Sequence, residues 1–549
     1  MKPNKTSKSP KFIVITGGVL SGLGKGIASA SIGRLLSSNL NIVPIKCDGY
    51  LNTDPGTMNP IEHGEVFVLD DGGEVDMDFG HYERFIGVDC KFEWNLTMGK
   101  VFKTILEKER RGDYLGHTVQ FIPHVTNEIK EWILRIVDNE KADLALIEIG
   151  GTVGDLENQF YIEAVRQLKS EVGEENIVFV HLTYIPIPSG VNEQKTKPTQ
   201  MSVRELNELG IEPDVVIGRC SEYLTPKIKE KIALYCNIEK EAVISGPDVR
   251  CVYEIPLIYE QEGLVAILHK KLGIYSPPDL KMWKERVDTI KENLVSPKET
   301  VTIAICGKYT ALEDSYASVV EALTHCGASL HARVQVKWVD TDCMETNEQS
   351  AGELLRGVQG VIVPGGFGAR GIEGKISVIR HCRENKVPYL GICYGMQLAV
   401  VEFARHVCGI AGANTAEVTA DGKKAEDPVI DILPDQKYVK EKGATMRLGG
   451  QDVIVKKNTL AYRILKNDTV RRRFRHRYEV NPAYIETLEK HGIVFSGRAS
   501  EKHIMQIMEL PDHPYFVGCQ FHPELTSKLE RPDPFFFNLV KNAMERTFA

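Results

Sequence analysis

Short apolar runs recur along the first half of the chain, separated by stretches in which apolar residues keep helical spacing. The runs cover residues 12–16, 41–47, 143–149, 177–187, 214–220 and 242–245. Buried strands that alternate with helices are typical of a parallel sheet covered on both faces. The pattern therefore predicts a doubly wound α/β domain over residues 11–275. Pro44 interrupts the second run, and because proline lacks a ladder donor we expect it at a strand end or an irregularity.

The pattern changes between residues 276 and 299. A Pro-Pro step is followed by an apolar stripe at helical spacing and then by Pro297. The stripe consists of Trp283, Val287, Ile290 and Leu294. This arrangement predicts an amphipathic linker helix.

A second alternation of apolar runs and helical segments begins after the linker. Apolar runs cover residues 301–306, 334–339, 360–363 and 388–392, and a helical segment covers 394–404. They predict a second doubly wound, mostly parallel α/β domain over residues 300–549. Within it, residues 421–443 are charged and lack periodicity, so we expect a long surface loop. Residues 1–10 have the composition of a disordered tail.

Composition narrows the class of protein. The 549 residues exceed what one hydrophobic core normally holds, and 42% hydrophobic and 26% charged residues are ordinary globular values. No apolar run approaches the roughly 18 residues that a membrane helix needs, so we expect no membrane association. The net charge of −8 gives no general attraction to nucleic acid. The twelve cysteines lack closely paired spacings, which favours free thiols in a reducing, cytoplasmic compartment.

The first chemical motif joins the first apolar run to a helix. Gly17 and Gly18 open a glycine-rich turn that ends at Gly24-Lys25, and residues 25–36 can form a helix. Small residues let backbone N–H groups converge on a polyphosphate, the helix N-terminus adds its dipole, and lysine supplies a mobile charge. The turn predicts a phosphate-binding loop, and a glycine-rich turn that binds nothing is the alternative. Gly26 stands where the common pattern has Ser or Thr for Mg²⁺, so a metal ligand must come from elsewhere.

The second motif places Cys393 between two glycines at an expected strand-to-helix turn. This arrangement resembles a nucleophile elbow, in which the turn exposes the side chain and the next backbone N–H can hold an oxyanion. His522 and Glu524 would complete a Cys-His-Glu triad of nucleophile, proton shuttle and orienting carboxylate. The glycine-rich segment 363–368 is a candidate for a second oxyanion donor. A single Cys or His is more often structural, and the combination favours catalysis.

These segments resemble known families. Residues 391–397 with His522-Pro523-Glu524 resemble class I glutamine amidotransferases. Residues 17–27, 80–85, 148–155 and 195–200 resemble CTP synthases, and the similarity runs from about residue 11 to the C-terminus through both halves and the linker. On this resemblance the chain is identified as a member of the CTP synthase family, with an N-terminal synthetase (amidoligase) domain and a C-terminal glutamine amidotransferase domain.

The resemblance implies a two-site enzyme. In the family, the second domain hydrolyses L-glutamine through a cysteinyl thioester, and ammonia passes through an internal tunnel to the first domain. There ATP phosphorylates O4 of UTP, and ammonia displaces the phosphate to give CTP. The resemblance further implies Mg²⁺ as cofactor, activation by GTP, inhibition by CTP at a site that overlaps the UTP site, and a homotetramer.

The resemblance also assigns residues to each ligand. Asp78 and Glu148 match the family's metal positions, and Lys46 is placed to serve the transferred phosphoryl group. The ATP-binding positions are Gly22, Leu23, Gly24, Lys25, Gly26, Ile27 and Asp78. The UTP and CTP positions are Ser21, Asp155, Leu156, Glu157, Lys195, Thr196, Lys197, Pro198, Thr199, Gln200 and Lys231. The glutamine positions are Gly366, Tyr394, Gly395, Met396, Gln397, Glu417 and Arg477.

The residue types at these positions suit their ligands. Lysines beside Pro198 put cations on a stiffened loop, as a triphosphate requires. For any single charged residue the alternative is a solvated surface group. The basic run 471–477 is interpreted as a solvated face rather than a nucleic-acid site, because the chain is acidic overall. His63 corresponds to a suggested tunnel gate, with a structural histidine as the alternative.

Two departures from the family pattern matter. Gly22 stands where many relatives have serine, which alters how one phosphate is held without removing the backbone cradle. Residues 421–443 fall in a variable part of the amidotransferase domain, so GTP contacts there are not carried over to this chain.

Three functions compete for the chain. The first is CTP synthesis, the second is another glutamine-dependent ATP amidoligase such as a corrinoid amidase, and the third is a non-enzymatic nucleotide-binding assembly protein. Segments 80–85 and 195–200 favour the first over the second, because they resemble UTP enzymes specifically. The complete set of Cys393, His522 and Glu524 argues against the third as the sole function.

Overall fold

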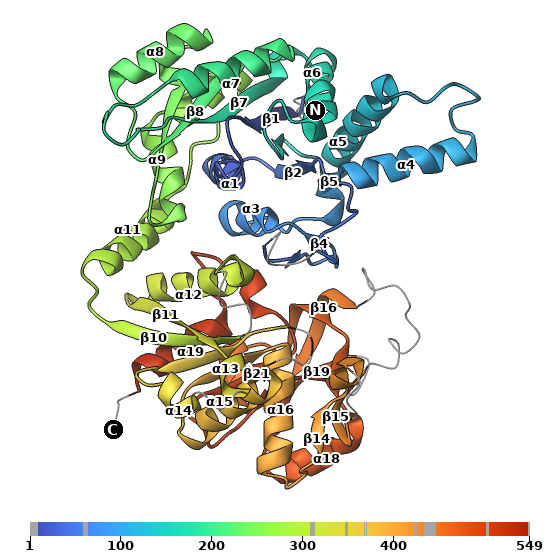
Figure 1. Cartoon of the computed structure of the whole chain (residues 1–549), viewed down its shortest axis with the longest axis vertical. Helices are drawn as coiled ribbons and strands as arrows, with labels where there is room; N and C mark the ends of the chain where they lie inside the picture. Colours follow the sequence, from blue (N-terminus) through green and yellow to red (C-terminus); the bar gives the residue numbers. More distant parts are fainter. Residues whose placement is uncertain are drawn as a thin grey trace, which may run out of the picture. The chain divides into compact units, whose positions relative to one another are not determined.

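The protein is described by a computed structural model that covers residues 9–58, 64–307, 313–345, 350–366, 368, 371–421, 425–432, 446–500 and 504–546. The chain divides into two compact units (Figure 1). The first comprises Met1–Pro55 and Asp78–Lys284, and the second comprises Gly56–Met77 and Glu285–Ala549. Within the described part, no helix is long and apolar enough to cross a membrane.

The first unit is built on a parallel sheet of seven strands. The strand order is β5 (Asn95–Thr97), β2 (Ile42–Asp48), β6 (Leu144–Ile149), β1 (Lys11–Gly17), β7 (Ile177–Tyr184), β8 (Val215–Cys220) and β9 (Val243–Pro247). Every apolar run predicted in the first half of the chain forms one of these strands. The three-residue strand β5 was not predicted, because so short a segment carries no periodic signal.

Helices cover this sheet on both faces, which is why β6 is buried along its whole length. They are α1 (Lys25–Leu36), α3 (Asp78–Ile86), α4 (Met98–Arg111), α5 (Thr126–Glu140), α6 (Gln159–Val172), α7 (Lys197–Glu208), α8 (Pro226–Cys236), α9 (Ile255–Gln261) and α10 (Leu264–Leu272). Helix α1 packs against α3 and α9, α5 packs against α6, and α7 packs against α8 (Figure 1). The predicted doubly wound α/β fold is confirmed for this unit.

Pro44 lies inside β2, and the expectation of a strand end or irregularity is wrong. It pairs in regular parallel register with Leu146 of β6. On the other side, β5 pairs with β2 only from Lys46 to Asp48. The missing N–H of Pro44 is tolerated because this part of β2 has a paired strand on one side only.

The second unit contains a nine-stranded sheet with a parallel half and an antiparallel half. The strand order is β11 (Arg333–Asp340), β10 (Thr300–Gly307), β12 (Gly360–Val363), β13 (Tyr389–Ile392), β21 (Phe516–Cys519), β20 (Met505–Glu509), β19 (Val494–Ala499), β16 (Arg447–Val455) and β17 (Thr469–His476). The strands from β11 to β21 are parallel, and the strands from β21 to β17 pair antiparallel. The parallel half holds all the strands predicted for this domain and confirms its α/β class.

Helices and two smaller sheets complete the second unit. The helices are α12 (Ala317–Leu330), α13 (Asp342–Glu345), α14 (Ala351–Leu354), α15 (Ile372–Glu384), α16 (Tyr394–His406), α17 (Leu460–Leu465), α18 (Pro482–Lys490) and α19 (Pro534–Met544). A three-stranded sheet joins β14 (Ala413–Thr415), β15 (Asp427–Ile432) and β18 (Tyr478–Val480), and a hairpin joins β3 (Phe67–Val68) to β4 (Glu74–Val75). The hairpin lies in the segment Gly56–Met77, which the sequence analysis had grouped with the first domain.

Part of the stretch 421–443, expected to be a long surface loop, is strand β15. Val429 and Ile430 are fully buried in this strand, which packs against α16. The expectation of a loop is therefore wrong for Asp427–Ile432, because a short buried apolar pair outweighs the surrounding charge. Residues 422–424 and 433–443 lie outside the described part of the chain.

Helix α11 (Lys281–Val295) lies in the segment predicted as a linker helix, and each of its ends belongs to a different unit. Trp283 is buried next to Phe85 in the first unit, and its Nε1 donates to the carbonyl of Tyr253 at 2.7 Å. Asn293 donates to the carbonyl of Ala332 in the second unit at 3.1 Å. The apolar stripe of the helix is thus used for packing along its length.

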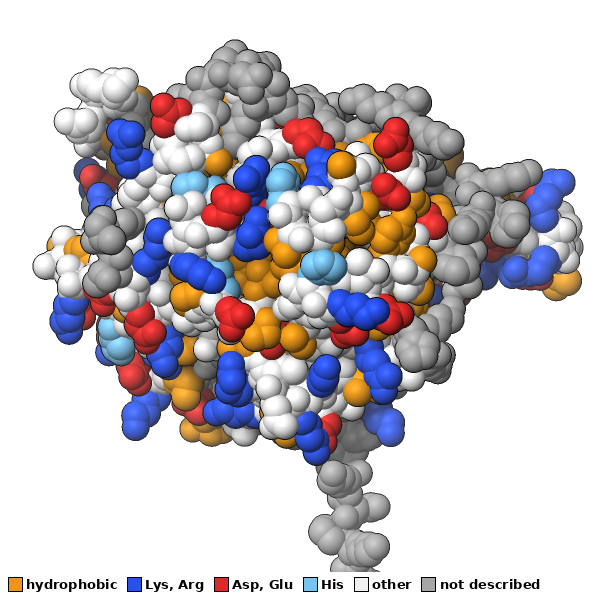
Figure 2. Space-filling view, turned by 90° about the horizontal axis from the view of Figure 1, so that it is seen from below, with side chains coloured by type: hydrophobic (Ala, Val, Ile, Leu, Met, Phe, Trp, Pro, Cys, Tyr) orange, Lys and Arg blue, Asp and Glu red, His pale blue; other side chains and the backbone are white. Residues whose placement is uncertain are grey.

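One face of the molecule carries Lys and Arg side chains interspersed with Asp and Glu side chains (Figure 2). Neither sign dominates this face. Such a surface fits the modest net charge of −8.

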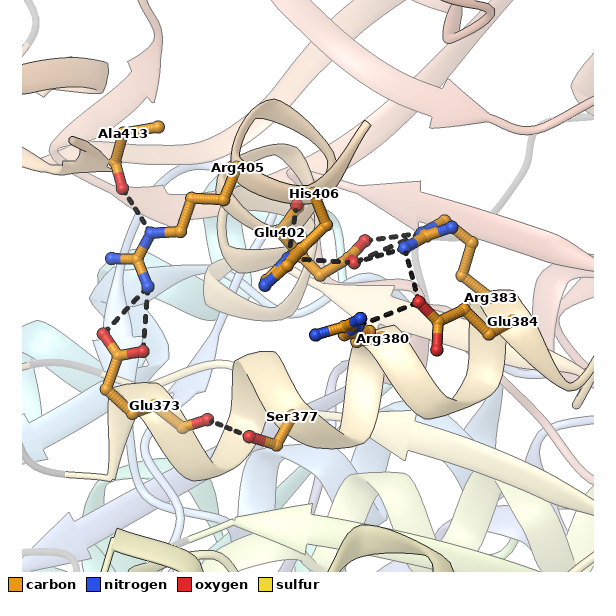
Figure 3. Close-up of polar contacts among 9 residues, drawn as sticks. All are labelled: Glu373, Ser377, Arg380, Arg383, Glu384, Glu402, Arg405, His406 and Ala413. Atoms are coloured by element: carbon orange, nitrogen blue, oxygen red, sulfur yellow. Dashed lines mark hydrogen bonds and ion pairs between the residues drawn. The ribbon is translucent and has the colours of Figure 1, made fainter. Parts of the chain in front are cut away.

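An ion-pair network joins α15 to α16 (Figure 3). The fully buried Glu402 carboxylate accepts hydrogen bonds from Nε and Nη2 of Arg383, at 2.9 and 2.8 Å. Arg405 on α16 pairs with Glu373 on α15 at 2.8 Å and donates to the carbonyl of Ala413 at 2.6 Å. Because Cys393 directly precedes α16, these contacts fix the helix on which the predicted nucleophile depends.

Replacing Glu402 with Leu should lower the free energy of unfolding by about 3 kcal/mol, because it leaves the half-buried Arg383 guanidinium with only the more exposed Glu384 carboxylate at 3.4 Å. Chemical denaturation followed by circular dichroism measures the change. Arg380→Ala, which removes an exposed pair with Glu384, is the matched control and should change stability by less than about 1 kcal/mol. Equal effects of the two substitutions would show that burial of the Glu402 pair is unimportant.

Candidate active sites

The loop between β1 and α1 has the backbone of an anion-binding turn. Val19, Gly22 and Gly24 adopt left-handed conformations, with φ of 81°, 74° and 83°. Such turns direct successive N–H groups into one concavity, and α1 begins directly afterwards at Lys25. For the β-branched Val19 this conformation is strained, as is common where a backbone is shaped for a ligand.

The Lys25 side chain folds back over the loop. Its Nζ donates to the carbonyl of Gly151 at 2.7 Å, just after the end of β6. A Cβ atom on Gly17 would lie 2.9 Å from Cδ of Lys25, so a side chain at this position would force the lysine to shift. Burial lowers the pKa of the Lys25 ammonium, and the nearby Glu148 carboxylate opposes that effect.

Gly26, which departs from the common phosphate-loop pattern, is explained by the position of Asp78. A Cβ atom on Gly26 would lie 1.9 Å from Oδ1 of Asp78, at the start of α3. The carboxylate therefore occupies the space that a Ser or Thr side chain would take. In the sequence, the lack of a Ser or Thr hydroxyl at Gly26 indicated that a metal ligand must come from another segment. The structure places Asp78, the candidate ligand, directly against Gly26.

Lys46 on β2 lies among three carboxylates. Its Nζ is 2.6 Å from Asp78, 3.3 Å from Asp48 and 3.7 Å from Glu148. Tyr82, on α3, donates to Oε2 of Glu148 at 2.5 Å. Burial raises the pKa of Glu148 to about 7, although Lys46 opposes the shift.

The carboxylates of this cluster are suitable ligands for Mg²⁺. Asp78 and Glu148 both approach the one ammonium group of Lys46, so two carboxylates converge on a small volume. Mg²⁺ is commonly held by one or two carboxylates together with phosphate oxygens and water. No cluster of three or more metal-binding side chains occurs among the described residues. The residues fit a Mg²⁺ ion that nucleotide phosphates also bind.

A buried histidine lies beneath the phosphate loop and was missed by the sequence analysis. His181 of β7 is 2.8 Å from the Thr16 hydroxyl through Nδ1 and 2.7 Å from the Ser202 hydroxyl through Nε2. Burial, assisted by the charge of Lys25, lowers the pKa of His181 to about 3. The neutral ring therefore ties β1 to α7. A lone histidine within an otherwise apolar strand was the available signal.

The predicted UTP segment forms the start of α7 and the loop before it. Lys197 begins the helix, Pro198 follows it, and Gln200 donates to the Thr196 hydroxyl at 3.0 Å. Lys195 pairs with Glu193 at 2.5 Å, and the nearby Lys231 also lowers the pKa of that carboxylate. The structure thus brings Lys195 and Lys231 to the same region.

The predicted nucleotide residues after β6 lie in a tight turn. Oδ2 of Asp155 accepts a hydrogen bond from the Thr152 N–H at 2.9 Å. Leu156 and Glu157 are exposed. No hydrogen bond or ion pair links this turn to the start of α7 within the described part of the unit.

Cys393 occupies the strained turn that the sequence predicted. It follows β13, precedes α16, and has φ of 50° and ψ of −98°. A Cβ atom on Gly395 would lie 2.0 Å from the carbonyl oxygen of Val363, so only glycine fits there. The buried Cys393 therefore stands in a strained strand-to-helix turn and borders a cavity, as the residue of a nucleophile elbow does.

His522 and Glu524 lie beside Cys393. Nδ1 of His522 is 2.7 Å from Oε1 of Glu524, which leaves Nε2 as the nitrogen available to the sulfur. A Cβ atom on Gly365 would be 2.9 Å from Cε1 of His522 and 3.7 Å from Cβ of Cys393. Burial disfavours the imidazolium, but Glu524 and the Cys393 sulfur outweigh it and raise the pKa of His522 to about 10. The three predicted triad residues are therefore brought together.

A cavity of about 430 Å³ opens on this triad within the second unit. Gly366 and Arg477, both predicted to hold glutamine, line it together with Cys393, His522 and Glu524. Glu417 lies to one side and accepts a hydrogen bond from the N–H of Gly368 at 2.7 Å, while Tyr394 donates to the carbonyl of that glycine at 3.0 Å. The cavity offers room and charged partners for a small zwitterion.

The segment Gly56–Met77 also lines this cavity, through residues that include Gly56, Glu65 and Val68. Its hairpin is held by the basic strand β17. Arg471 pairs with Asp70 at 2.8 Å, Arg475 pairs with the buried Glu74 at 2.7 Å, and Arg473 donates to the carbonyl of Val68 at 3.2 Å. The intervening Arg472 pairs with Asp533 at 3.1 Å.

These pairings correct the interpretation of residues 471–477 as a solvated face. Because side chains alternate along a strand, the odd-numbered arginines face the hairpin and Arg472 faces the other side. Sequence periodicity did not reveal Asp70 and Glu74 as partners of these arginines, because they lie 401 residues away along the chain. His63, the suggested gate, lies outside the described residues.

Comparison with known proteins covers both units. The family profile described as CTP synthase N-terminus matches residues 11–274, and the profile described as glutamine amidotransferase class-I matches residues 311–542. A CTP synthase of Borreliella burgdorferi is 53% identical over 534 residues, which is 97% of this chain and 99% of that protein. A CTP synthase of Archaeoglobus fulgidus is 51% identical over 536 residues, which is 97% of this chain and 98% of that protein.

Solved structures are similar to part of the chain. A structure described as the glutaminase domain of Trypanosoma brucei CTPS with bound acivicin is 35% identical, covers 45% of this chain and 96% of that chain, and has a TM-score of 0.41. Family membership rests on the full-length matches, which include the β1–α1 loop, the acidic cluster around Lys46 and the Cys393, His522 and Glu524 positions. The chain belongs to the CTP synthase family.

Proposed function

We propose that this chain catalyses the ATP-dependent amination of UTP to CTP, with ammonia released from L-glutamine. The observation that carries the proposal is that one chain of this family holds two different sites. The first unit has a phosphate loop beside the cluster of Lys46, Asp78 and Glu148, and the second unit has a cavity bordered by Cys393 and His522. A ligase that takes nitrogen from glutamine needs both a phosphoryl-transfer site and a glutaminase site.

Family membership confirms the predicted class of enzyme, a glutamine-dependent ligase that forms CTP. The same matches disfavour a different amidoligase, because the profile that matches residues 11–274 is described as CTP synthase N-terminus. The roles of individual residues below are our proposals.

In the glutaminase step, His522 takes the proton of Cys393 and the thiolate attacks the carboxamide carbon of glutamine. The backbone N–H groups of Tyr394 and Gly366 would hold the oxyanion. His522 returns the proton to the leaving ammonia, and water then cleaves the thioester to give glutamate. Glu524 keeps the His522 ring oriented through Nδ1.

We assign glutamine binding to the residues that the family resemblance implies. The Arg477 guanidinium suits the carboxylate of glutamine, and Glu417 suits its ammonium group. The remaining positions are Gly366, Tyr394, Gly395, Met396 and Gln397. Support comes from Gly366 and Arg477, which line the same cavity as Cys393.

In the synthetase step, we assign the ATP phosphates to residues 22–27, with Lys25 as the mobile cation. Asp78 and Glu148 would hold Mg²⁺, which neutralises phosphate charge when bound. Lys46 lies between these carboxylates and would accompany the phosphoryl group that passes to O4 of UTP. Ammonia, proposed to arrive through an internal passage, attacks C4 and displaces phosphate to give CTP.

The pyrimidine nucleotide is assigned to three segments of the first unit. They are Ser21, residues 155–157, and residues 195–200 with Lys231. Because CTP differs from UTP only at C4, the same triphosphate site would accept CTP as an inhibitor. Activation by GTP is proposed from the family alone. A cytoplasmic location is supported by the twelve cysteines, which form no disulfide within the described part of the chain.

An apolar surface on the first unit supports a homo-oligomer, proposed to be a tetramer. Leu115 is 88% exposed and Phe121 is 61% exposed. Phe121 stacks on Phe160, with ring centroids 5.1 Å apart, and Phe102 lies 6.3 Å from Phe121. Exposed aromatic clusters of this kind are typical of protein interfaces.

Cys393→Ala should remove glutamine-dependent CTP formation by roughly 1,000-fold or more, since it removes the atom that forms the thioester. CTP formation from ammonium at alkaline pH should persist, because free ammonia needs no glutaminase. Chromatographic measurement of CTP with each nitrogen source tests the proposal. Retained glutamine-dependent synthesis would refute the triad, and loss of both activities would mark Cys393 as structural.

Gly26→Ala should impair the synthetase step and leave the glutaminase step intact. The new methyl group displaces the Asp78 carboxylate, so CTP formation from either glutamine or ammonia should fall on the order of 10- to 100-fold. Glutamine hydrolysis should continue. Ser31→Ala, in the same helix, is the matched control, because it removes a buried hydroxyl that has no hydrogen-bond partner in the described part of the chain. Full activity of Gly26→Ala would remove Asp78 from the site.

Leu115→Asp should shift the protein toward smaller assemblies, because a carboxylate at a buried interface is costly. Light scattering coupled to size-exclusion chromatography measures the mass in multiples of 61.4 kDa. Leu234→Asp, at a position 79% exposed on α8, is the control and should leave the mass unchanged. An unaltered mass of the Leu115 variant would show that this surface is not an interface.

A further inference from the structure

Two buried amide side chains lie directly beneath Cys393. We propose that Gln520 stabilises the Cys393 thiolate by donating a hydrogen bond to its sulfur, and that Gln397 holds the Gln520 amide in the orientation that this requires. The inference rests on the proposed role of Cys393 as the glutaminase nucleophile. It adds a residue that neither the triad nor the predicted glutamine positions include.

Gln520 is fixed at the end of β21, two residues before His522. Its side chain is fully buried, and Nε2 lies 3.5 Å from Sγ of Cys393. Its backbone N–H donates to the carbonyl of Gln506 on β20 at 2.9 Å. The amide is therefore held on the protein side of the sulfur by a packed strand end.

The orientation of the Gln520 amide is determined by Gln397. Nε2 of Gln397 donates to the backbone carbonyl of Tyr478 at 2.7 Å, and a carbonyl oxygen can only accept. The second hydrogen on Nε2 of Gln397 points to Oε1 of Gln520 at 3.2 Å. Because its oxygen is engaged in this way, Gln520 presents its NH₂ group to the sulfur.

Two neutral groups therefore act on different protonation states of Cys393. The carbonyl of Arg475, 3.6 Å from Sγ, can accept a hydrogen bond from the thiol but would repel a thiolate. The NH₂ group of Gln520 stabilises the thiolate, because hydrogen bonds to charged acceptors are stronger than those to neutral ones. As His522 withdraws the proton, the favourable partner changes from Arg475 to Gln520.

Other titratable groups surround the sulfur and must be separated from this effect. Those that line the cavity with Cys393 are Glu65, Tyr316, Arg475, Arg477, His522 and Glu524. Cys519, next to Gln520, is fully buried, and burial raises the pKa of its thiol well above the ordinary value. Gln520 carries no charge, so replacing it with Leu leaves the net charge of the site unchanged.

The arrangement also refines the proposed role of Gln397. Both hydrogens of its NH₂ group are used inside the protein, by Tyr478 and Gln520. Only its Oε1 is left to contact glutamine, as a hydrogen-bond acceptor. Gln397 would thus link the substrate to the orientation of Gln520.

The test is the pH dependence of Cys393 alkylation by iodoacetamide, which reports the thiolate directly. Gln520→Leu should raise the pH midpoint of alkylation by about one unit, the size expected for one lost hydrogen bond to a charged group. Gln520→Glu, which places a carboxylate at the sulfur, should raise it further. Peptide mass spectrometry separates Cys393 from the partly exposed Cys343 and Cys408.

Gln506→Leu is the matched control. This buried amide lies on the adjacent strand β20, and its side chain has no hydrogen-bond partner among the described residues. Its alkylation midpoint should equal that of the unmodified protein. CTP formation from ammonia, which needs no glutaminase, reports that each variant is folded.

An unchanged alkylation midpoint in folded Gln520→Leu would overturn the proposal. If that variant fails to fold, Gln397→Leu decides the question. This substitution leaves Gln520 in place but frees its amide to rotate, so the alkylation midpoint should rise. An unchanged midpoint in Gln397→Leu would also overturn the proposal. Retained glutamine hydrolysis by Cys393→Ala would instead refute the proposed glutaminase nucleophile. The two failures are therefore distinguishable.

Discussion

Both sites depend on an oxygen that approaches a glycine so closely that any side chain there would force a neighbouring group to move. Oδ1 of Asp78 lies 1.9 Å from the Cβ position of Gly26, and the carbonyl oxygen of Val363 lies 2.0 Å from that of Gly395. In each unit a parallel strand ends, the chain turns sharply, and the first turn of the following helix packs against a neighbouring segment. A methyl group at either glycine would separate the turn from the groups that it must position.

The second unit depends on long-range ion pairs as well as on packing. The arginines of β17 hold the β3–β4 hairpin through Asp70 and Glu74, and this hairpin borders the Cys393 cavity. The chain passes from the second unit to the first between Met77 and Asp78. The segment Gly56–Met77, which borders the cavity at Cys393, is therefore followed directly in the sequence by Asp78, a proposed Mg²⁺ ligand.

Buried neutral groups support the charged ones in each site. His181 remains uncharged between two hydroxyls and joins the phosphate-loop strand to the helix that starts with the predicted UTP segment. Gln397 and Gln520 form a comparable chain beneath Cys393. In both places the hydrogen-bond partners set the direction of donors and acceptors without adding net charge, which a buried site tolerates at low energetic cost.

The sequence by itself determined the parallel strands, the glycine-rich turn between β1 and α1, the sharp turn at Cys393 and the family, because these features are written in local spacing and in contiguous motifs. It did not determine the position of Pro44 within β2, the strand β15, or the membership of residues 56–77 in the second unit. Those features depend on neighbours that are distant along the chain: Arg475 and Glu74 are 401 residues apart, and Gln520 and Cys393 are 127 residues apart. Local periodicity records which side chains are buried, whereas only the tertiary structure decides which buried or charged group each one meets.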